Sequence, residues 1–499
     1  MWWNKYISFG IDQNIHPIKN QPMKTSYLLF SILLMSLMSI GSSIAQTSES
    51  TKTVVVFTNA TVIDGTGATP MENATILIED ERIACVGECE IPDGAKVIDT
   101  GGKYIIPGLV DAHVHYDGSG WFDTRPGFMG FNVNDRFPIA EVGAEQREYP
   151  ERFHRSYLCS GVTAVFDIGG QPWTLDVRDD AKGSKAAPHI ASAGPMLTTM
   201  PYLEPDARAL NINMVDEESV RFGVRVLSWL GSDAVKIVLE SGPKDREAVR
   251  SLLRVVAEEA NRAGLPVIAH ASGLENAKDA LWEGNASMLA HSVLPERVDD
   301  EFLELARRND AVYVTHNGRQ KTILAALSMV NPNRAIFRFP EQEIPLDCVD
   351  PVTRSKLRLT ESLPTPETNV EVVDSYRAEL ESEYSRILEN LKRVHEAGIT
   401  VAIGSDAGNP LTVHGPAIFM EMEGLAKAGL TPMEVLVAST RNGAKAMGRL
   451  DEFGTLEEGK IADLVVLEKN PLEDISNVRS IELVVRSGKV WTREEFKYE

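Results

Sequence analysis

The fold that we expect for this chain is set by one stretch of sequence, PGLVDAHVH at residues 107–115. It is an apolar run that ends in two histidines, as expected of a buried strand with a polar end. Seven further apolar runs follow it, with amphipathic helical patterns such as 245–263 and 372–397 among the connections. The predicted strands are residues 109–115, 164–168, 190–193, 234–239, 267–270, 287–291, 312–315 and 400–404. Eight strand–helix units predict an α/β protein with a (β/α)8 TIM barrel, whose active site lies at the C-terminal ends of the strands.

Short β-branched runs lie at both ends of the chain. Before the barrel they occupy 53–59, 61–64, 74–79 and 82–86, and after it 463–467, 481–486 and 489–492. Turn signals such as Asp64-Gly65 and Ser487-Gly488 bound some of these runs. Because β segments at opposite ends of a chain commonly complete one subdomain, we predict a small antiparallel β unit made from both ends.

The first 45 residues have the pattern of a targeting segment. Lys24 lies just before an apolar run at 28–40, and the small residues Ser43 and Ala45 follow that run. This pattern predicts a signal peptide at 23–45 that is cleaved before Gln46, so that the protein is exported to the periplasm or secreted. An uncleaved N-terminal anchor is the alternative.

Composition excludes several classes of protein. The 499 residues carry a formal net charge of −22, and 43% of them are hydrophobic. This acidity argues against a nucleic-acid partner, and the composition is that of a globular protein. Four cysteines are too few for a disulfide scaffold, and none is predicted to be catalytic. Cys85 and Cys89 flank a turn and could either pair or remain thiols.

Polar residues gather where the predicted strands end. Because side chains alternate along a strand, His113 and His115 should point to the same side, toward the barrel lumen. His270, His291 and Asp406 each close an apolar strand in the same way. Any one of them would be better explained as a buried histidine or a helix cap, but together they predict a metal site.

Lys236 lies in the middle of the apolar run 234–239. A buried lysine is costly unless its amine is neutral or paired with a carboxylate. A neutral amine can capture carbon dioxide to form a carbamate, whose two oxygens can bridge two metal ions. Pairing with Asp406 is the alternative, and Lys236 alone does not decide between the two.

Together these motifs resemble the amidohydrolase superfamily, in its imidazolonepropionase-like and prolidase-like branch. The resemblance covers almost all of the chain after the targeting segment. Its marks are PGLVDAHVH at 107–115, Lys236, His270-Ala271, His291, GSDAG at 404–408, His414-Gly415, ASTRNGA at 438–444, GTLEEGKIADL at 454–464 and NPL at 470–472. The resemblance implies a metallohydrolase barrel at 107–448 and a β-sandwich built from 46–106 and 449–499, after a targeting segment at 1–45.

The resemblance also implies a binuclear metal centre that acts on a small-molecule substrate. His113, His115 and Asp406 would bind the more buried ion, and His270 and His291 the more exposed one. Lys236, as a carbamate, would bridge the two ions. Zinc is the expected metal, with manganese or cobalt as alternatives. Asp406 would orient the attacking hydroxide and pass its proton to the leaving nitrogen, as a general acid–base catalyst.

Around the pocket the chain departs from the pattern of the branch. Val165-Phe166-Asp167 stands where Arg-Asp is usual, residues 194–199 stand in place of a Gly-Gly-His turn, and Ala290 stands in place of a glutamate. None of these positions is a predicted ligand, so the reaction class is expected to hold while the substrate class is open.

Several residues could contact the substrate. The candidates, each with packing as its alternative, are Tyr116, Trp121, His316 and His414. The Pro-rich stretch 318–369 is expected to be a long loop after the seventh strand. Its cations Arg319, Lys321, Arg334 and Arg338 could bind a substrate carboxylate, or they could be solvated surface charges.

The expected function is hydrolysis of an amide, in a dipeptide, a peptide-like amide or a cyclic amide. Hydrolysis of esters, lactones or phosphotriesters by the same centre is the second hypothesis. A deaminase with one metal and a non-catalytic binding protein are weaker, because Lys236 suits two ions and the full ligand set is present. No membrane span is expected after signal cleavage, and the oligomeric state is open, including a homo-oligomer.

Overall fold

The structure is a computed structural model, and it describes residues 52–125, 128, 131–199, 211–239, 245–316, 345–363 and 370–498. The predicted targeting segment lies outside these residues, as do Arg319, Lys321, Arg334 and Arg338. No helix within the described ranges combines the length and the apolar character that a membrane crossing needs.

Parallel strands form the part of the protein that carries the predicted ligands. One sheet has three strands in the order β6-β7-β8, and another has seven in the order β10-β9-β11-β12-β13-β14-β15. Their bounds are β6 Leu109–Val114, β7 Val162–Asp167, β8 His189–Ser192, β9 Met196–Thr198, β10 Asn211–Asn213, β11 Val235–Val238, β12 Val267–His270, β13 Met288–Leu289, β14 Val312–Thr315 and β15 Val401–Ile403. Every pair of neighbours in these sheets is parallel. The α/β class and all eight predicted strands are confirmed, whereas β9 and β10 were not predicted.

Backbone hydrogen bonds connect the two parallel sheets. The Asp406 N–H donates to His113 O at 2.8 Å, and the His115 N–H donates to Ala407 O at 2.8 Å. These bonds place the residues that follow β15 beside the end of β6. Elsewhere the Asp233 N–H, just before β11, donates to Ser192 O at the end of β8 at 2.9 Å.

On one face of the parallel strands, mostly small and β-branched side chains form an apolar cluster. Its members lie two residues apart along the strands, as in Val312 and Val314 on β14. The cluster also includes Ala234, just before β11, and Ile268 on β12. Because side chains alternate, the residue two positions further along each strand is expected on the same face. Those residues are Lys236, His270 and His316.

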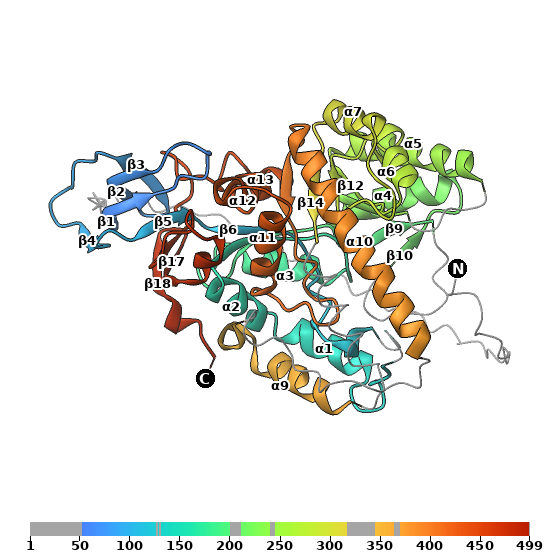
Figure 1. Cartoon of the computed structure of the whole chain (residues 1–499), viewed down its shortest axis with the longest axis horizontal. Helices are drawn as coiled ribbons and strands as arrows, with labels where there is room; N and C mark the ends of the chain where they lie inside the picture. The colour runs from blue at the N-terminus through green and yellow to red at the C-terminus, as the bar shows by residue number, and fades with distance from the viewer. Residues whose placement is uncertain are drawn as a thin grey trace, which may run out of the picture. The chain divides into compact units, whose positions relative to one another are not determined.

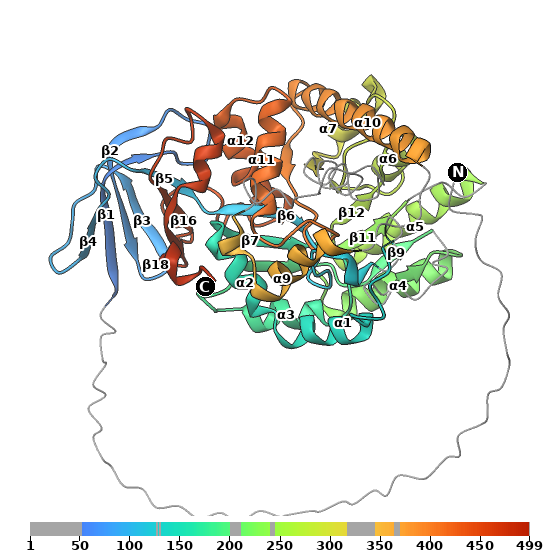
Figure 2. The same ribbon diagram turned by 60° about the horizontal axis from the view of Figure 1, so that its bottom comes forward.

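Helices lie along the connections between the strands (Figures 1 and 2). Their bounds are α1 Ile139–Glu148, α2 Glu151–Cys159, α3 Thr174–Ala181, α4 Glu217–Leu230, α5 Arg246–Ala263, α6 Leu274–Trp282, α7 Asp300–Arg308, α9 Pro351–Leu359, α10 Val370–Glu396, α11 Ala417–Lys427, α12 Pro432–Ala438 and α13 Arg441–Ala446. Local sequence fixes their ends. Asp245 caps α5 by accepting hydrogen bonds from the N–H groups of Glu247 and Ala248, and Gly264 ends the helix at φ +70°.

Strands from both ends of the chain form one eight-stranded sheet, in the order β18-β17-β16-β5-β1-β2-β3 with β4 paired to β1. The bounds are β1 Val54–Val62, β2 Met71–Glu79, β3 Arg82–Gly87, β4 Lys96–Asp99, β5 Tyr104–Pro107, β16 Leu464–Leu467, β17 Ile481–Arg486 and β18 Lys489–Thr492. The antiparallel pair β5–β16 joins the two ends. Both views show this sheet at the opposite end of the molecule from α4 to α7 (Figures 1 and 2).

Two disulfides link the four cysteines. Cys85 pairs with Cys89, one of the two outcomes expected for them. Cys159, at the end of α2, pairs with Cys348 across 189 residues of sequence, a link that was not predicted. Closure of so long a loop restricts the unfolded chain and stabilises the fold by about 5 kcal/mol in the loop-entropy account.

The described part of the stretch 318–369 is not the irregular loop that was expected. Residues 345–363 contain α9 and the short 3-10 helices Leu346–Cys348 and Thr360–Ser362. Asp350 caps α9 through the N–H groups of Val352 and Thr353, and proline stands at its start. Lys356 on α9 forms a buried ion pair with Asp123 at 2.7 Å, which fixes this segment to the residues after β6.

Candidate metal centre

Three of the predicted ligands meet at the end of β6. His113 lies on β6, His115 directly follows it, and Asp406 follows β15. The Nε2 atoms of His113 and His115 are 3.2 Å apart, and each lies 3.1 Å from Asp406 Oδ1. All three side chains are buried. Within the described ranges, these are the three His, Cys, Asp or Glu residues whose ligand atoms gather within 4.8 Å of one another.

The donor set fits a divalent metal ion. Zinc and related ions bind imidazole nitrogen and carboxylate oxygen at about 2.0–2.2 Å, which puts neighbouring ligand atoms of one ion roughly 3 Å apart. Burial lowers the pKa of His113 well below its usual value, so its ring is neutral and can offer a nitrogen lone pair to a cation.

Backbone geometry holds Asp406 against His113. Asp406 has a φ of +58°, in the left-handed region that aspartate tolerates better than most residues. Asn409 Nδ2 donates to Asp406 Oδ1 at 2.6 Å and so orients the carboxylate. Gly404 permits the close approach, because a Cβ there would lie 2.4 Å from His113 Cβ.

Two residues that were not predicted, Gly169 and Asp111, form hydrogen bonds that orient the site. His115 Nδ1 donates to Gly169 O at 2.6 Å, so Nε2 carries the lone pair that faces Asp406. Asp111 accepts from the N–H of Ser405 at 2.9 Å and from its hydroxyl at 2.5 Å, which ties β6 to the residue before Asp406. Burial raises the pKa of Asp111 to about 7. Its place in the 107–115 stretch was the only signal for Asp111, and no sequence signal marks Gly169.

The second pair of predicted histidines lies beside this group. The ring of His291 is 4.0 Å from that of His270 and 4.9 Å from that of His113, measured between centroids. His270 ends β12, and His291 follows β13. Burial lowers the pKa of His291 well below its usual value, so its ring is neutral and can offer a lone pair to a metal.

Lys236 lies in the middle of β11 with only 2% of its surface exposed. Burial lowers the pKa of its amine to about 7, although the charge of Asp406 opposes this shift. Among the described residues, Lys236 forms no ion pair within 4.0 Å, so the alternative of direct pairing with Asp406 is not seen. The amine is therefore desolvated and close enough to the centre to interact with Asp406 and His113 electrostatically.

Of the four candidates for substrate contact, His316 lies nearest the predicted ligands. It follows β14, and its Nδ1 is 3.0 Å from Nδ1 of His291. Trp121 is fully buried, and its Nε1 donates to Thr360 Oγ1 at 2.8 Å.

Tyr116 and His414 lie together inside the protein, on the side of helix α2. His414 Nε2 donates to Gly118 O at 2.8 Å, and its Nδ1 accepts from the hydroxyl of Tyr157 at 2.7 Å. Burial lowers the pKa of His414 to about 3. The ring of Tyr116 packs against that of Phe153 on α2, at 6.1 Å between centroids. Substrate contact by Tyr116, Trp121 and His414 stays a prediction.

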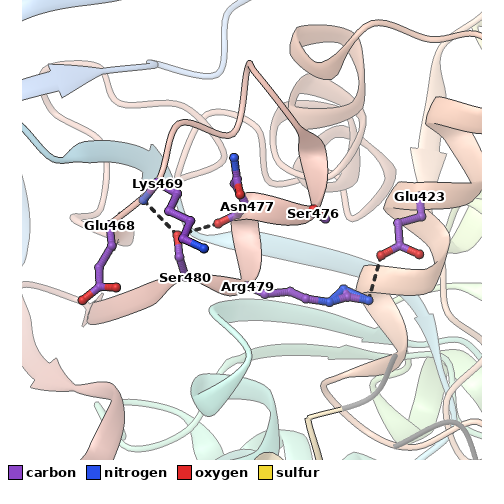
Figure 3. A pocket seen from close by; sticks show the side chains of 7 residues that line it. All are labelled: Glu423, Glu468, Lys469, Ser476, Asn477, Arg479 and Ser480. Atoms are coloured by element: carbon purple, nitrogen blue, oxygen red, sulfur yellow. Dashed lines mark hydrogen bonds and ion pairs between the residues drawn. The ribbon is translucent and has the colours of Figure 1, made fainter. Parts of the chain in front are cut away.

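A surface pocket of about 540 Å³ contains none of the predicted site residues. Figure 3 shows its polar lining, in which Arg479 extends toward Glu423 and pairs with it at 2.8 Å. Among the described residues, the group of three neighbouring metal-binding side chains is His113, His115 and Asp406, and none of them lines this pocket, so the candidate site is the cluster at the end of β6.

Several known proteins are similar to this chain. A model of the amidohydrolase family matches residues 104–491 of the chain. Ochratoxinase from Aspergillus niger is 25% identical over 478 residues, which cover 90% of this chain and 88% of that protein. Imidazolonepropionase from Agrobacterium fabrum is 26% identical over 454 residues, which cover 85% of this chain and 89% of that protein.

Solved structures show a shared fold. A Xaa-Pro dipeptidase with bound methionine superposes with a TM-score of 0.65 at 21% identity, over 88% of this chain and 100% of that chain. The structure of the A. niger ochratoxinase gives a TM-score of 0.64 at 23% identity, over 88% of this chain and 96% of that chain.

Proposed function

The chain belongs to the amidohydrolase family, and from this premise we propose that it is an exported hydrolase that uses two divalent metal ions to cleave an amide bond in dipeptides or peptide-like amides. Family membership makes it a hydrolase of carbon–nitrogen bonds with a TIM-barrel-like α/β fold. The observation that carries the proposal is the cluster of His113, His115 and Asp406, with Lys236 buried nearby.

Each ligand has a part in the proposal. His113, His115 and Asp406 would hold one ion, His270 and His291 the other, and a carbamate on Lys236 would bridge them. Zinc suits this mixture of nitrogen and oxygen donors. Bound divalent ions supply a water of lowered pKa and polarise the carbonyl of the substrate.

The remaining steps belong to the residues of the chain. The carboxylate of Asp406 accepts the proton of the attacking water and returns it to the leaving nitrogen, so that the amine departs neutral. Asn409 keeps the carboxylate oriented through both steps, because its amide donates to Oδ1 at 2.6 Å. Burial of the site excludes bulk water from competing for these contacts.

The architecture in this proposal is a closed barrel with a β-sandwich from both chain ends. Closure is supported by the backbone hydrogen bonds that run from Asp406 to His113 and from His115 to Ala407. The part of the proposal in which both chain ends build one β unit is supported by the single sheet that contains β1 to β5 and β16 to β18.

Export is supported by the two disulfides, because disulfides persist mainly in oxidising compartments. We expect the mature chain to begin at Gln46 and to contain no titratable thiol. Intact-mass measurement of the secreted or periplasmic protein, before and after reduction and alkylation, checks both points. A mature form that retains residues 28–40, or four alkylated cysteines without reduction, would contradict the proposal.

A substrate screen tests the proposed reaction. The zinc-loaded protein should hydrolyse members of a dipeptide library that carry a free C-terminal carboxylate, and amidated forms of the same dipeptides much more slowly. Release of free amine, measured with a fluorogenic reagent, follows both sets. Cyclic amides, lactones and phosphotriesters complete the panel. Activity confined to lactones or phosphotriesters would mean that the centre is as proposed and the substrate class is wrong.

A further inference from the structure

The side chain of His316 makes direct contact with a predicted metal ligand, His291. Its Nδ1 is 3.0 Å from Nδ1 of His291, and the two rings meet edge-on at 4.3 Å between centroids. The two side chains are buried, with 5% and 4% of their surfaces exposed. Val312 and Val314, which precede His316 at intervals of two on β14, belong to the apolar cluster that lines the same face of the strands.

Such a contact between two imidazole rings requires one donor and one acceptor. A neutral ring carries a single N–H, on either Nδ1 or Nε2. If His316 donated, His291 would accept on Nδ1 and carry its proton on Nε2, so neither nitrogen could bind a metal. If His291 donates from Nδ1, its Nε2 keeps a lone pair.

We propose that His316 is a positioning residue, which accepts the Nδ1 proton of His291 and so directs the Nε2 lone pair of His291 toward the second metal ion. This inference rests on the proposed function, because it takes His291 to be a metal ligand. His115 is arranged in the same way on the first ion, since its Nδ1 donates to Gly169 O and its Nε2 faces Asp406. The acceptors differ. His291 donates to the ring of His316, whereas His115 donates to a backbone carbonyl.

A second account of the short contact makes His316 itself a ligand that shares an ion with His291. Three ligand atoms would then gather near one point, as they do at His113, His115 and Asp406. A separation of 3.0 Å between two ring nitrogens is that of a hydrogen bond, and the two accounts predict different effects of substitution.

Two substitutions separate these accounts. The amide oxygen of His316→Asn can replace Nδ1 as an acceptor, whereas His316→Leu removes the acceptor and keeps a similar volume. Wild type and both variants are loaded with zinc and dialysed against graded zinc buffers, and bound zinc is measured by mass spectrometry. Loss of the group that orients a ligand typically weakens metal binding about 10- to 100-fold.

We expect His316→Leu to bind the second zinc ion about 10- to 100-fold more weakly, with the first ion unchanged. His316→Asn should stay within about threefold of wild type. Unchanged zinc binding in His316→Leu would overturn the inference. Equal loss in both variants would also overturn it, in favour of direct ligation by His316.

A spectroscopic measurement covers the case in which a variant misfolds. In metal-free wild type with 15N-labelled histidine, the Nδ1 of His291 should give the shift of a protonated nitrogen and its Nε2 that of an unprotonated one. The reverse pattern would overturn the inference without any substitution. Wild type that binds no zinc would refute the proposed function instead, and the nitrogen shifts would still decide whether His291 donates to His316.

Discussion

Asp406→Asn is expected to lower kcat by roughly two to four orders of magnitude, the usual contribution of a general acid–base group. Asparagine has the shape of aspartate and keeps an oxygen that can face His113 and His115, so most of the metal should stay bound. It cannot accept the proton of water at neutral pH, so proton transfer to the leaving nitrogen is lost. Steady-state kinetics and zinc content of the same samples check both parts of the expectation.

Asp463→Asn provides a matched control for that substitution. Asp463 is also buried, but it lies just before β16, accepts from the N–H of Ser487 at 2.7 Å and faces His189. Its loss should affect the free energy of unfolding and leave kcat close to that of wild type. Near-normal turnover in Asp406→Asn would exclude the proposed role of that carboxylate, whatever the control shows.

Lys236→Ala is expected to remove one of two metal ions and to lower kcat roughly a thousandfold, since one metal supplies several kcal/mol of transition-state stabilisation. The substitution also leaves a cavity in place of the buried lysine side chain. Short carboxylic acids such as acetate or propionate should enter this cavity, replace the carbamate and restore part of both the activity and the second ion. Zinc content and rate, measured against acid concentration, should rise together.

Lys278→Met is the corresponding control for removal of a buried lysine. Lys278 lies on α6 and pairs with Asp299 and Glu301 at 2.6 Å each, and it contacts none of the predicted ligands. We expect this variant to keep both ions and to be insensitive to added acids. Full activity of Lys236→Ala with one ion per chain would contradict a bridging role for Lys236.

Much of the fold follows from local sequence because the parallel strands are short apolar runs between amphipathic helices. β12 and β14 begin and end at the predicted residues, and α5 begins one residue later than expected because Asp245 is its cap. β9 and β10 have three residues each, which is too short for a strand period to be recognised. β10 pairs with β9, and β9 pairs with β11, so both strands are recognised from their place in the sheet rather than from local sequence.

The site residues that could be predicted are polar residues with apolar neighbours in the sequence. His113, His115 and Asp406 were found because a polar residue at the end of a buried strand is unusual. Partners that are backbone atoms, such as the carbonyl of Gly169, leave no trace in sequence. The link between Cys159 and Cys348 spans 189 residues, and its pairing depends on a segment whose position only the fold determines.

The clearest test of the account is X-ray diffraction from crystals of the zinc-loaded protein, recorded on both sides of the zinc absorption edge. We predict two anomalous peaks, one bounded by His113, His115 and Asp406 and the other by His270 and His291. Density for a carbamate on Lys236 should lie between them. A single peak, or an unmodified Lys236 that contacts neither ion, would contradict the binuclear centre.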